Sequence, residues 1–263
     1  MRITIGIIGG GNMGQAIASR ICKKYKVLVC EKDSTKQDQL KRKLHLPVKD
    51  LDAVVCQSKI IILAVKPQDF DVVLAEVKGN ITKNQLVISI AAGITTSYIE
   101  KSLGDEIRVV RTMPNMPAQI GEGITAVCRG KSATSQDVKL TAQIFTFIGK
   151  TVIVDENLID AITAVSGSGP AYVFLVVECL LRAAQTLGLN ESITQELVNT
   201  TVLGSVHLLN QSKEDAAQLR AKVTSKGGTT QAAMDVFFAH KIEEIFAEAL
   251  QAARKRAEEL AKK

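Results

Sequence analysis

Along the first 155 residues or so, short apolar runs typical of strands alternate with segments whose apolar residues have helical spacing. Short apolar runs rich in β-branched residues predict strands, and several are apolar throughout, as expected of parallel strands covered on both faces. These runs lie at residues 3–8, 26–30, 60–65, 86–90, 108–113, 125–128 and 151–154. Segments with helical spacing lie between them, at residues 15–24, 36–44, 69–77 and 136–148. This alternation predicts a doubly wound α/β domain with a mostly parallel sheet.

The pattern changes after about Leu158, beyond which no strand-like run follows. The segment 171–181 is apolar on every face, so a helix there must be covered all round. We therefore predict an α/β domain over residues 1–157, an all-α domain over 158–263, and an intimate homodimer that covers the helices. A further amphipathic helix near the end is predicted by apolar residues three and four apart: Ile242, Ile245, Phe246, Ala249, Leu250, Ala253, Ala257 and Leu260.

Composition and charge exclude several classes of protein. Charged residues make up 23% of the 263 positions, an ordinary globular share, and the net charge is +6. The basic clusters at 41–43 and 254–256 have no interleaved aromatic residues, so we expect no nucleic-acid partner. Residues 1–14 lack the features of a signal peptide, and 171–181 is too short to span a bilayer. We expect a soluble protein with no membrane partner.

Cysteine and histidine positions indicate a reducing compartment and no metal site. The five cysteines form no C-x-x-C pair and lie among apolar neighbours, which is typical of small buried side chains in a cytoplasmic protein. The three histidines, His45, His207 and His240, are far apart in the sequence and do not resemble a metal-ligand set.

A glycine-rich loop follows the first predicted strand. Gly9, Gly11 and Gly14 satisfy the pattern G-x-G-x-x-G between a strand and a helix, within one βαβ unit. In this pattern Gly9 permits the tight turn, Gly11 lets the backbone approach a pyrophosphate, and Gly14 allows the helix to pack closely on the strand. Amide groups at the helix N-terminus then face the phosphates. We predict a Rossmann domain that binds a dinucleotide.

The residues after the second strand give conflicting signals about that dinucleotide. Glu31 lies 20 residues beyond Gly11, where an acid holds the ribose 2′-hydroxyl and favours NAD. Lys32, beside it, would attract a 2′-phosphate and favour NADP. The predicted cofactor is therefore NADPH or NADH, with NADH tolerated.

Two short loops lie where strands of such a sheet end, which is the edge at which open α/β sheets bind ligands. One comprises Ala64, Val65, Lys66 and Pro67, and the other begins with Ala91 and Ala92. Small residues there permit close approach of a nicotinamide or ribose, and Lys66 could meet a phosphate or order its loop. Simple strand-ending turns are the alternative interpretation.

The second half offers two glycine-containing stretches. Residues 166–170 precede the apolar helix, and a cap at Ser168 or Gly169 explains them locally, with a role in shaping a neighbouring site left open. Residues 227–230, Gly-Gly-Thr-Thr, precede another helix and expose amides that can point at a carboxylate-sized anion. Capping by threonine is the alternative, although the Glu or Gln of a capping box is absent.

Side chains for acid–base chemistry are inconspicuous in the sequence. No Ser/His/Asp order, paired carboxylates or metal cluster stands out. A nicotinamide enzyme needs few protein acids when its substrate already carries the proton, as a protonated cyclic imine does.

Across essentially its whole length, the sequence resembles pyrroline-5-carboxylate reductases, the last enzymes of proline biosynthesis. GIIGGGNMG is common to many Rossmann proteins, whereas SGSGPAY and VTSKGGTT, in this order and separation, are specific to that family. The motifs that carry the resemblance are GIIGGGNMG at 6–14, LAVKP at 63–67, SIAAGI at 89–94, RTMPNMP at 111–117, SGSGPAY at 166–172 and VTSKGGTT at 223–230.

The resemblance implies a Rossmann domain followed by an all-helical dimerisation domain, with dimers often assembled into larger rings. It implies NAD(P)H-dependent reduction of the C=N bond of L-1-pyrroline-5-carboxylate to L-proline. It also implies a site between the nicotinamide pocket of one subunit and the Gly-Gly-Thr-Thr loop of its dimer mate.

Site residues follow from the same resemblance, position by position. Backbone amides of Gly228 and Thr229 would receive the substrate carboxylate, and Thr230 would be the catalytic residue, bound near the ring nitrogen. The implied substrate-binding residues are Glu156 (by weaker alignment), Ser225, Gly227, Gly228, Thr229 and Thr230. The implied cofactor-binding residues, besides Gly9, Gly11, Gly14, Glu31 and Lys32, are Asn12, Met13, Ala64, Val65, Lys66, Pro67, Ala91 and Ala92.

Two positions depart from the family pattern. Lys226 stands where the family usually has proline, which loosens the loop but adds a positive charge beside the expected carboxylate site. Glu31-Lys32 replaces the family's usual Asn-Arg or serine-containing sequence, which argues against strict NADP preference. The alternatives are another two-domain Rossmann reductase, such as a β-hydroxyacid dehydrogenase, and a sensor that binds the cofactor without catalysis.

Overall fold

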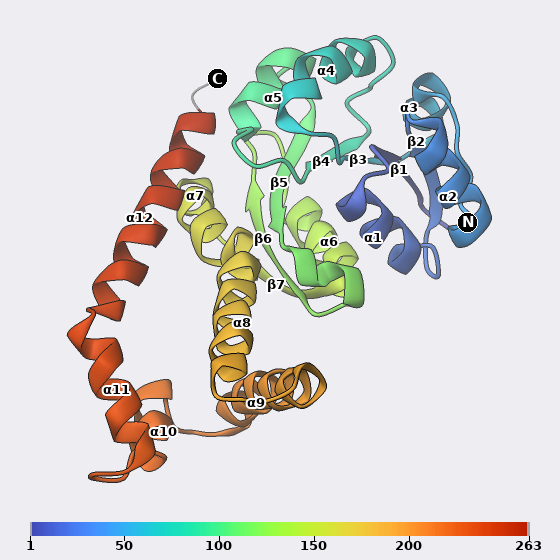
Figure 1. Cartoon of the computed structure of the whole chain (residues 1–263). Coiled ribbons are helices and arrows are strands. Elements are labelled where there is room, and N and C mark those ends of the chain that lie inside the picture. Colours follow the sequence, from blue (N-terminus) through green and yellow to red (C-terminus); the bar gives the residue numbers. More distant parts are fainter. Residues whose placement is uncertain (1, 262–263) are drawn as a thin grey trace. The chain divides into compact units, whose positions relative to one another are not determined.

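The computed structural model describes residues 2–261, which separate into two compact units (Figure 1). The first unit runs to Ser168 and takes in the chain again from Ala253, and the second comprises Gly169–Ala252. The compact units therefore divide 11 residues later than the predicted boundary at 157, because the helical turns after it still pack on the sheet.

A seven-stranded sheet forms the centre of the first unit, in the order β2-β1-β3-β4-β5-β6-β7. The first five strands in this order are parallel, β6 is antiparallel to β5, and β7 is parallel to β6. All seven predicted strands are present, so the predicted mostly parallel sheet is confirmed. Their bounds are β1 Thr4–Ile8, β2 Lys26–Cys30, β3 Ile60–Leu63, β4 Leu86–Ser89, β5 Arg108–Pro114, β6 Gly123–Arg129 and β7 Gly149–Ile153.

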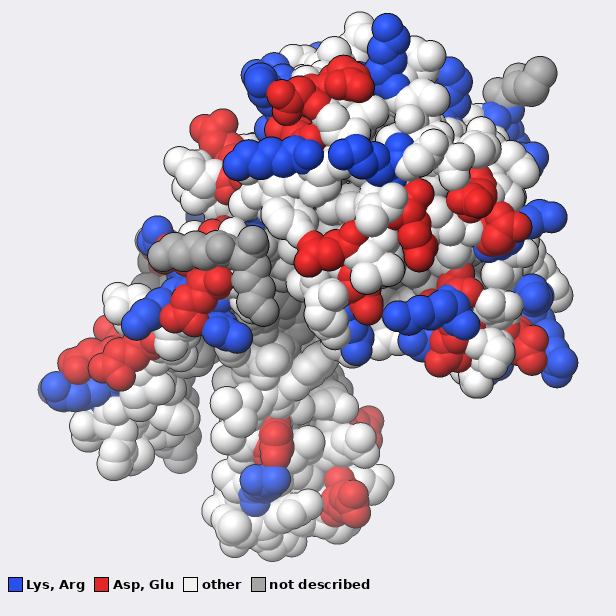
Figure 2. All heavy atoms as spheres, turned by 90° about the horizontal axis from the view of Figure 1, so that it is seen from above, with Lys and Arg blue, Asp and Glu red and all other residues white. Residues whose placement is uncertain are grey.

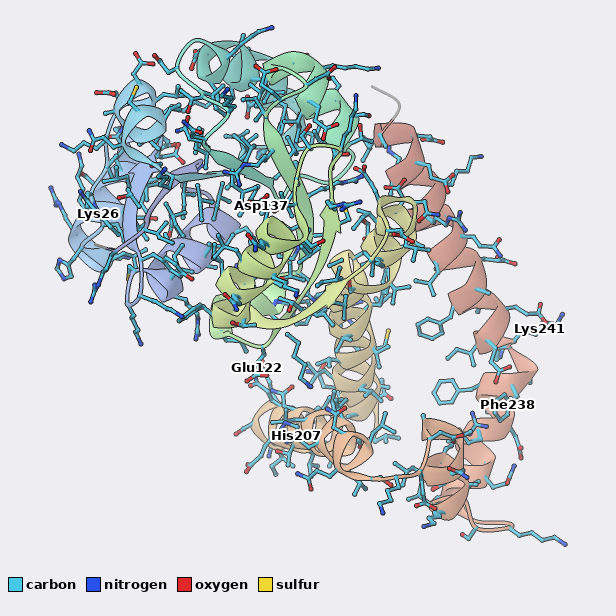
Figure 3. All side chains as sticks on the ribbon, turned by 180° about the vertical axis from the view of Figure 1, so that it is seen from behind. Lys26, Glu122, Asp137, His207, Phe238 and Lys241 are labelled. Carbon is cyan, nitrogen blue, oxygen red and sulfur yellow. The ribbon has the colours of Figure 1, made fainter. Side chains whose placement is uncertain are left out.

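Helices cover both faces of this sheet, which is why its strands are apolar on both sides. One core contains Ile7 and Val110 beneath α1, α2 and α6, and the other contains Ile8 and Val109 beneath α3, α4 and α5. Asp137 of α6, labelled in Figure 3, also pairs with Arg108 of β5 at 2.5 Å. The bounds are α1 Asn12–Ile21, α2 Ser34–Leu44, α3 Leu51–Gln57, α4 Phe70–Lys78, α5 Thr96–Leu103 and α6 Ser135–Phe145.

Two of these helices, α3 and α5, are absent from the sequence prediction. With 7 and 8 residues they are too short to show a clear helical period. Each carries a capping signal instead: the Asp50 side chain accepts a hydrogen bond from the Ala53 amide, and Thr95 accepts one from the Tyr98 amide.

The carboxyl ends of β1, β3 and β4 meet at one edge of the sheet. Ile8 is in register with Leu63, and Leu63 is in register with Ser89. The loops that follow these three residues therefore leave the sheet side by side. They are the glycine-rich loop and the two loops in which cofactor-lining residues are predicted.

Short turns connect several of the larger elements. The 3-10 segments are Pro67–Asp69, Met116–Ile120, Thr146–Ile148 and Glu156–Leu158. After the last of these, α7 (Ile159–Ile162) places Ile159 against Ala126 and Cys128 of β6. A π-helical turn, Thr163–Gly167, then leads into α8.

Only Ser168 separates the π-helical turn from α8, and its backbone angles are helical (φ −84°, ψ −20°), so the chain is helical from Glu156 to Thr186. The proposed cap at Ser168 or Gly169 is wrong, since the preceding residues are already helical and the Ser168 amide donates to the Thr163 carbonyl at 2.8 Å. The expectation that this segment is too short to span a bilayer rested on residues 171–181 alone and is also corrected. By length and composition alone the 31-residue segment could cross a membrane, a test that core helices of soluble proteins also pass.

The second unit is all-helical and leaves most of its apolar surface exposed. Among its residues, only Thr194 is buried, whereas Phe174 is 58% exposed and Phe238, labelled in Figure 3, is 43% exposed. Five such helices in one chain thus lack a hydrophobic core of their own. They are α8 Gly169–Thr186, α9 Glu191–Gln211, α10 Ala216–Lys222, α11 Thr229–Ala239 and α12 Ile242–Ala261, the last of which ends in the first unit.

Charges of both signs are interspersed over the first unit on the face shown in Figure 2. The net charge of +6 is therefore not gathered there into one continuous basic surface.

Candidate functional site

The glycine-rich loop occupies the carboxyl end of β1, and its glycines meet different steric demands. Gly9 has φ +108°, and a Cβ on Gly14 would overlap the Gly9 carbonyl oxygen. A Cβ on Gly11 would meet no heavy atom within 4 Å. The turn and the close helix–strand contact thus match the roles predicted for Gly9 and Gly14, and the loop is open at Gly11.

Helix α1 begins directly after Gly11 and has no side-chain cap. Its first-turn amide groups therefore keep their donors, and the dipole of the helix favours an anion at this end. Asn12 is exposed and Met13 is half-buried against the core. Open space at Gly11 beside uncapped amides fits the pyrophosphate of a dinucleotide.

Glu31 lies at the end of β2, next to the glycine-rich loop. Its Oε2 accepts a hydrogen bond from the Gly10 amide at 2.7 Å, and its Oε1 accepts one from the Asp33 amide at 2.9 Å. Lys32 points elsewhere, with its Nζ 3.4 Å from Asp69 Oδ1 and its side chain 84% exposed. The structure therefore fixes the carboxylate at the loop and leaves the ammonium group outside it.

The loop Ala64–Pro67 packs against the glycine-rich loop. The Ala64 amide donates to the Ile8 carbonyl at 2.8 Å, and a Cβ on Gly9 would lie 2.5 Å from the Ala64 carbonyl oxygen. Val65 is half-buried, whereas Lys66 and Pro67 are exposed. Of the next loop, Ala91 is buried and its amide donates to Ser89 Oγ at 3.3 Å, and Ala92 is half-buried. The structure brings all these predicted cofactor-binding residues to one edge.

The Gly-Gly-Thr-Thr loop lies in the second unit, at the start of α11. Gly227 has φ +72°, which favours glycine, and Gly228 is the N-cap residue without a side-chain cap. The capping role considered for the threonines is therefore wrong. The Gly228 amide donates to the Ser225 carbonyl at 3.0 Å, so the uncapped amides of the first turn begin at Thr229.

Glu156 is the one predicted substrate residue that lies on the sheet unit. Its Oε1 accepts from the Thr96 amide at 2.8 Å and from Arg111 Nη1 at 3.2 Å, and its Oε2 accepts from Thr96 Oγ1 at 2.6 Å. Asp160 completes the cluster, 3.6 Å from Arg111 Nη2. Sequence reasoning missed Thr96, Arg111 and Asp160, although an arginine inside the apolar run of β5 was a visible signal.

Two cysteines lie next to the residues described above: the Cys30 carbonyl accepts a hydrogen bond from the Gly9 amide at 2.8 Å, and Cys128 is buried in β6. Burial raises the pKa of Cys30 to about 11 and that of Cys128 to about 12, with neighbouring carboxylates adding to both shifts. Among residues 2–261, no group of three or more His, Cys, Asp or Glu side chains could hold a metal ion.

Comparison with known proteins yields two matching family models. The one described as NADP oxidoreductase, coenzyme F420-dependent, matches residues 4–93, and the one described as pyrroline-5-carboxylate reductase dimerisation matches residues 156–260. A strand–glycine loop–helix unit of this geometry, joined to such a helical region, defines a Rossmann-type NAD(P)-dependent oxidoreductase.

Similar proteins narrow the class further. The pyrroline-5-carboxylate reductases of Synechocystis sp. and Methanosarcina acetivorans are 40% and 37% identical, with 100% and 98% of this chain and of each relative covered. The solved reductase from Coxiella burnetii is 36% identical with a TM-score of 0.89 over 100% of both chains. The Plasmodium falciparum enzyme, solved with NADP bound, is 30% identical with a TM-score of 0.88 over 98% of both.

The chain belongs to the pyrroline-5-carboxylate reductase family. Its activity is therefore NAD(P)H-dependent reduction of pyrroline-5-carboxylate, the proline-forming step of proline biosynthesis. The matched helical region is a dimerisation domain, in agreement with the exposed apolar surface of the second unit.

Proposed function

We propose that this chain reduces the C=N bond of L-1-pyrroline-5-carboxylate with the Gly-Gly-Thr-Thr loop as its substrate anchor. The observation that carries this assignment is the bare start of α11: Gly228 is the N-cap, no side chain caps the helix, and the first turn holds no acidic residue. A carboxylate is the complement of such a helix end.

The substrate carboxylate is received by the amides of Thr229 and Thr230. The resemblance implied Gly228 and Thr229, but the Gly228 amide is engaged by Ser225 within the turn. Moving the contact one residue along the chain leaves Gly227 and Gly228 to shape the loop and Ser225 to hold it. Lys226, which is exposed in the same turn, adds positive charge next to the bound anion.

Thr230 is the residue that meets the reacting group. Its hydroxyl hydrogen-bonds the substrate beside the ring nitrogen and holds the imine carbon in one orientation. When bound, the dihydronicotinamide supplies the hydride. No protein acid is needed, because the cyclic imine carries its proton before reduction. The loop therefore contributes binding and orientation rather than proton transfer.

Cofactor preference is set by Glu31. Each of its oxygens accepts one amide hydrogen bond and keeps lone pairs for a ribose 2′-hydroxyl, while its charge repels a 2′-phosphate. We propose that NADH is favoured over NADPH. Glu31→Ala should raise the NADPH/NADH ratio of kcat/KM roughly tenfold or more, from loss of a charged contact of about 1.5–3 kcal/mol. Lys32→Ala is the matched control; a selective loss of NADPH activity in that variant would assign the preference to Lys32 instead.

The helical unit assembles with a second copy of the chain. We propose a soluble, cytoplasmic homodimer, with larger rings of dimers built from it, in which the partner covers the apolar segment that by itself could cross a membrane. On the face shown in Figure 2, charges of both signs are interspersed, which supports the absence of a nucleic-acid partner there.

An assay of purified protein with L-1-pyrroline-5-carboxylate and either NADH or NADPH tests the proposed function. We expect cofactor oxidation with stoichiometric formation of proline, faster with NADH. Tight NADH binding without turnover would support the sensor alternative. In a parallel assay with a β-hydroxyacid and NAD+ or NADP+, reduction of the cofactor there and no turnover of pyrroline-5-carboxylate would support a dehydrogenase of the other Rossmann class.

A further inference from the structure

A buried ion-pair cluster lies beside the loop that carries Ala91 and Ala92. Arg111 is 2% exposed and has the largest fully buried side chain among residues 2–261. It faces two carboxylates, with Nη1 3.2 Å from Glu156 Oε1 and Nη2 3.6 Å from Asp160 Oδ1. A guanidinium removed from water needs such partners, because an unpaired buried charge is strongly destabilising.

Glu156 connects this cluster to the loop. Both of its carboxylate oxygens are engaged by Thr96, the first residue of α5, through the amide at 2.8 Å and the hydroxyl at 2.6 Å. The loop 90–95 ends where these bonds begin. Since Glu156 is held at the same time by Arg111, the cation fixes the carboxylate and the carboxylate fixes the end of the loop.

The rest of the loop is fixed as well. The Ala91 amide donates to Ser89 Oγ at 3.3 Å, and the Ser89 carbonyl accepts from Thr112 Oγ1 at 2.9 Å. Gly93, at φ +73°, lies beneath the last turn of α12, where an added Cβ would be 2.7 Å from Leu260 Cβ. At the far end, Thr95 caps α5 by accepting from the Tyr98 amide, and Glu156 ties that end to Arg111 of β5 through Thr96.

Three buried polar atoms of the cluster have no hydrogen-bond partner among the described residues: Arg111 Nε, Arg111 Nη2 and Asp160 Oδ1. Arg111 therefore makes one direct hydrogen bond within the cluster, and that bond goes to Glu156. Loss of the Glu156 charge would leave the guanidinium poorly paired. The weaker hold on Glu156 should in turn loosen the loop, because Glu156 is bonded to Thr96 at the end of the loop.

We propose that Glu156 is a positioning residue, held by Arg111, which fixes the loop 90–95 against the nicotinamide end of the cofactor and does not contact the substrate. This assignment rests on the proposed function, which places the cofactor at this edge of the sheet. It replaces the substrate-binding role that the sequence resemblance implied for Glu156.

Glu156→Gln, Thr96→Val and the double variant test this assignment. NADH affinity is measured by fluorescence titration, independently of turnover, and KM for pyrroline-5-carboxylate is measured at saturating NADH. We expect each single variant to weaken NADH binding roughly three- to tenfold, as loss of one hydrogen bond predicts. The double variant should be no worse than the more affected single variant, because both remove the same link. KM for the imino acid should change less than NADH affinity.

Two controls separate positioning from general damage. Thr96→Ser keeps the hydroxyl and should retain wild-type NADH affinity, and Asp155→Asn removes the exposed neighbouring carboxylate and should change nothing. If Glu156→Gln fails to fold, Thr96→Val still reports on the same link.

A raised KM for pyrroline-5-carboxylate in Glu156→Gln, with unchanged NADH affinity and a silent Thr96→Val, would overturn the proposal and make Glu156 a substrate ligand. Independent, additive effects of the two variants would also overturn it. Wild-type protein that binds neither NADH nor NADPH would contradict the proposed function itself, which is a different outcome from a bound cofactor with unaffected variants.

Discussion

The glycines of the glycine-rich loop differ in the space around them. Gly14 touches the Gly9 carbonyl so closely that no side chain fits, whereas Gly11 faces open space. Both positions satisfy one sequence pattern, yet the first is required by packing and the second is free for a ligand. Substitution by alanine therefore separates folding from cofactor binding.

Gly11→Ala should leave the melting temperature near that of the wild type and weaken NADH binding roughly tenfold or more, since a methyl group obstructs phosphate contacts of about 1.5–3 kcal/mol. Gly14→Ala should instead destabilise the fold by about 1–3 kcal/mol through overpacking. Thermal unfolding and NADH titration of both variants check the difference. Equal loss of stability in the two variants would contradict it.

Thr230 is the residue at which substrate orientation can be tested. Thr230→Ala removes one hydrogen bond to a charged or developing group, worth about 1.5–3 kcal/mol. We expect kcat to fall roughly tenfold to a hundredfold, while NADH affinity, measured by titration, stays within twofold of the wild type. Thr229→Ala keeps its amide and serves as the control. An unchanged kcat/KM in Thr230→Ala would remove this residue from the catalytic role.

At the scale of elements, the strands determine which thiols can react. Cys30 ends β2 and Cys128 lies inside β6, and burial holds both thiols in the protonated form, with pKa values of about 11 and about 12. Cys56, on the short helix α3, is exposed. The thiolate is the reactive species, so these cysteines should differ sharply in alkylation.

We expect iodoacetamide at pH 8 to label Cys56 within minutes and to leave Cys30 and Cys128 unlabelled in the folded protein, as read by peptide mass spectrometry. The raised pKa values also predict a loss of stability in alkali. The thiols ionise in the unfolded chain near pH 8.5, but in the folded chain only near pH 11–12, so stability present below pH 8.5 falls as pH rises through this window. Cys128→Ala should reduce that fall, as measured by the free energy of unfolding between pH 8 and pH 11.

At the scale of the whole molecule, the two units differ in where their apolar side chains lie. The sheet unit buries them in two cores between its layers, whereas the helical unit exposes them along nearly every helix. An exposed apolar surface of this extent marks an interaction site, and the family match identifies it as a dimerisation region.

Phe174→Arg should therefore weaken the dimer. An uncompensated charge in a buried interface costs about 3 kcal/mol or more, which raises the dissociation constant roughly a hundredfold. Val72→Arg is the matched control, because Val72 is 63% exposed on α4 of the sheet unit. Sedimentation velocity at micromolar concentration should show monomers for the first variant and dimers for the second. A wild-type protein that is a stable, active monomer would contradict the proposed assembly.

Much of the sheet unit followed from local pattern. The seven strands and four of its helices were visible because each has a clear period or an uninterrupted apolar run. The short helices α3 and α5 were not, and neither was the continuous helix through Ser168, since seven or eight residues hold too few repeats and a π-helical turn disguises the period.

By itself the sequence determined the α/β architecture, the position of the nucleotide loop and the family motifs, because each rests on residues close together in the chain. Only the tertiary structure decided how charged groups far apart in sequence are used. It placed Glu31 on the Gly10 amide and left Lys32 outside, and it joined Glu156 to Arg111 and to Thr96, which lie 45 and 60 residues away in the sequence. Such pairings depend on which strand ends meet at one edge of the sheet, and local periodicity carries no information about that.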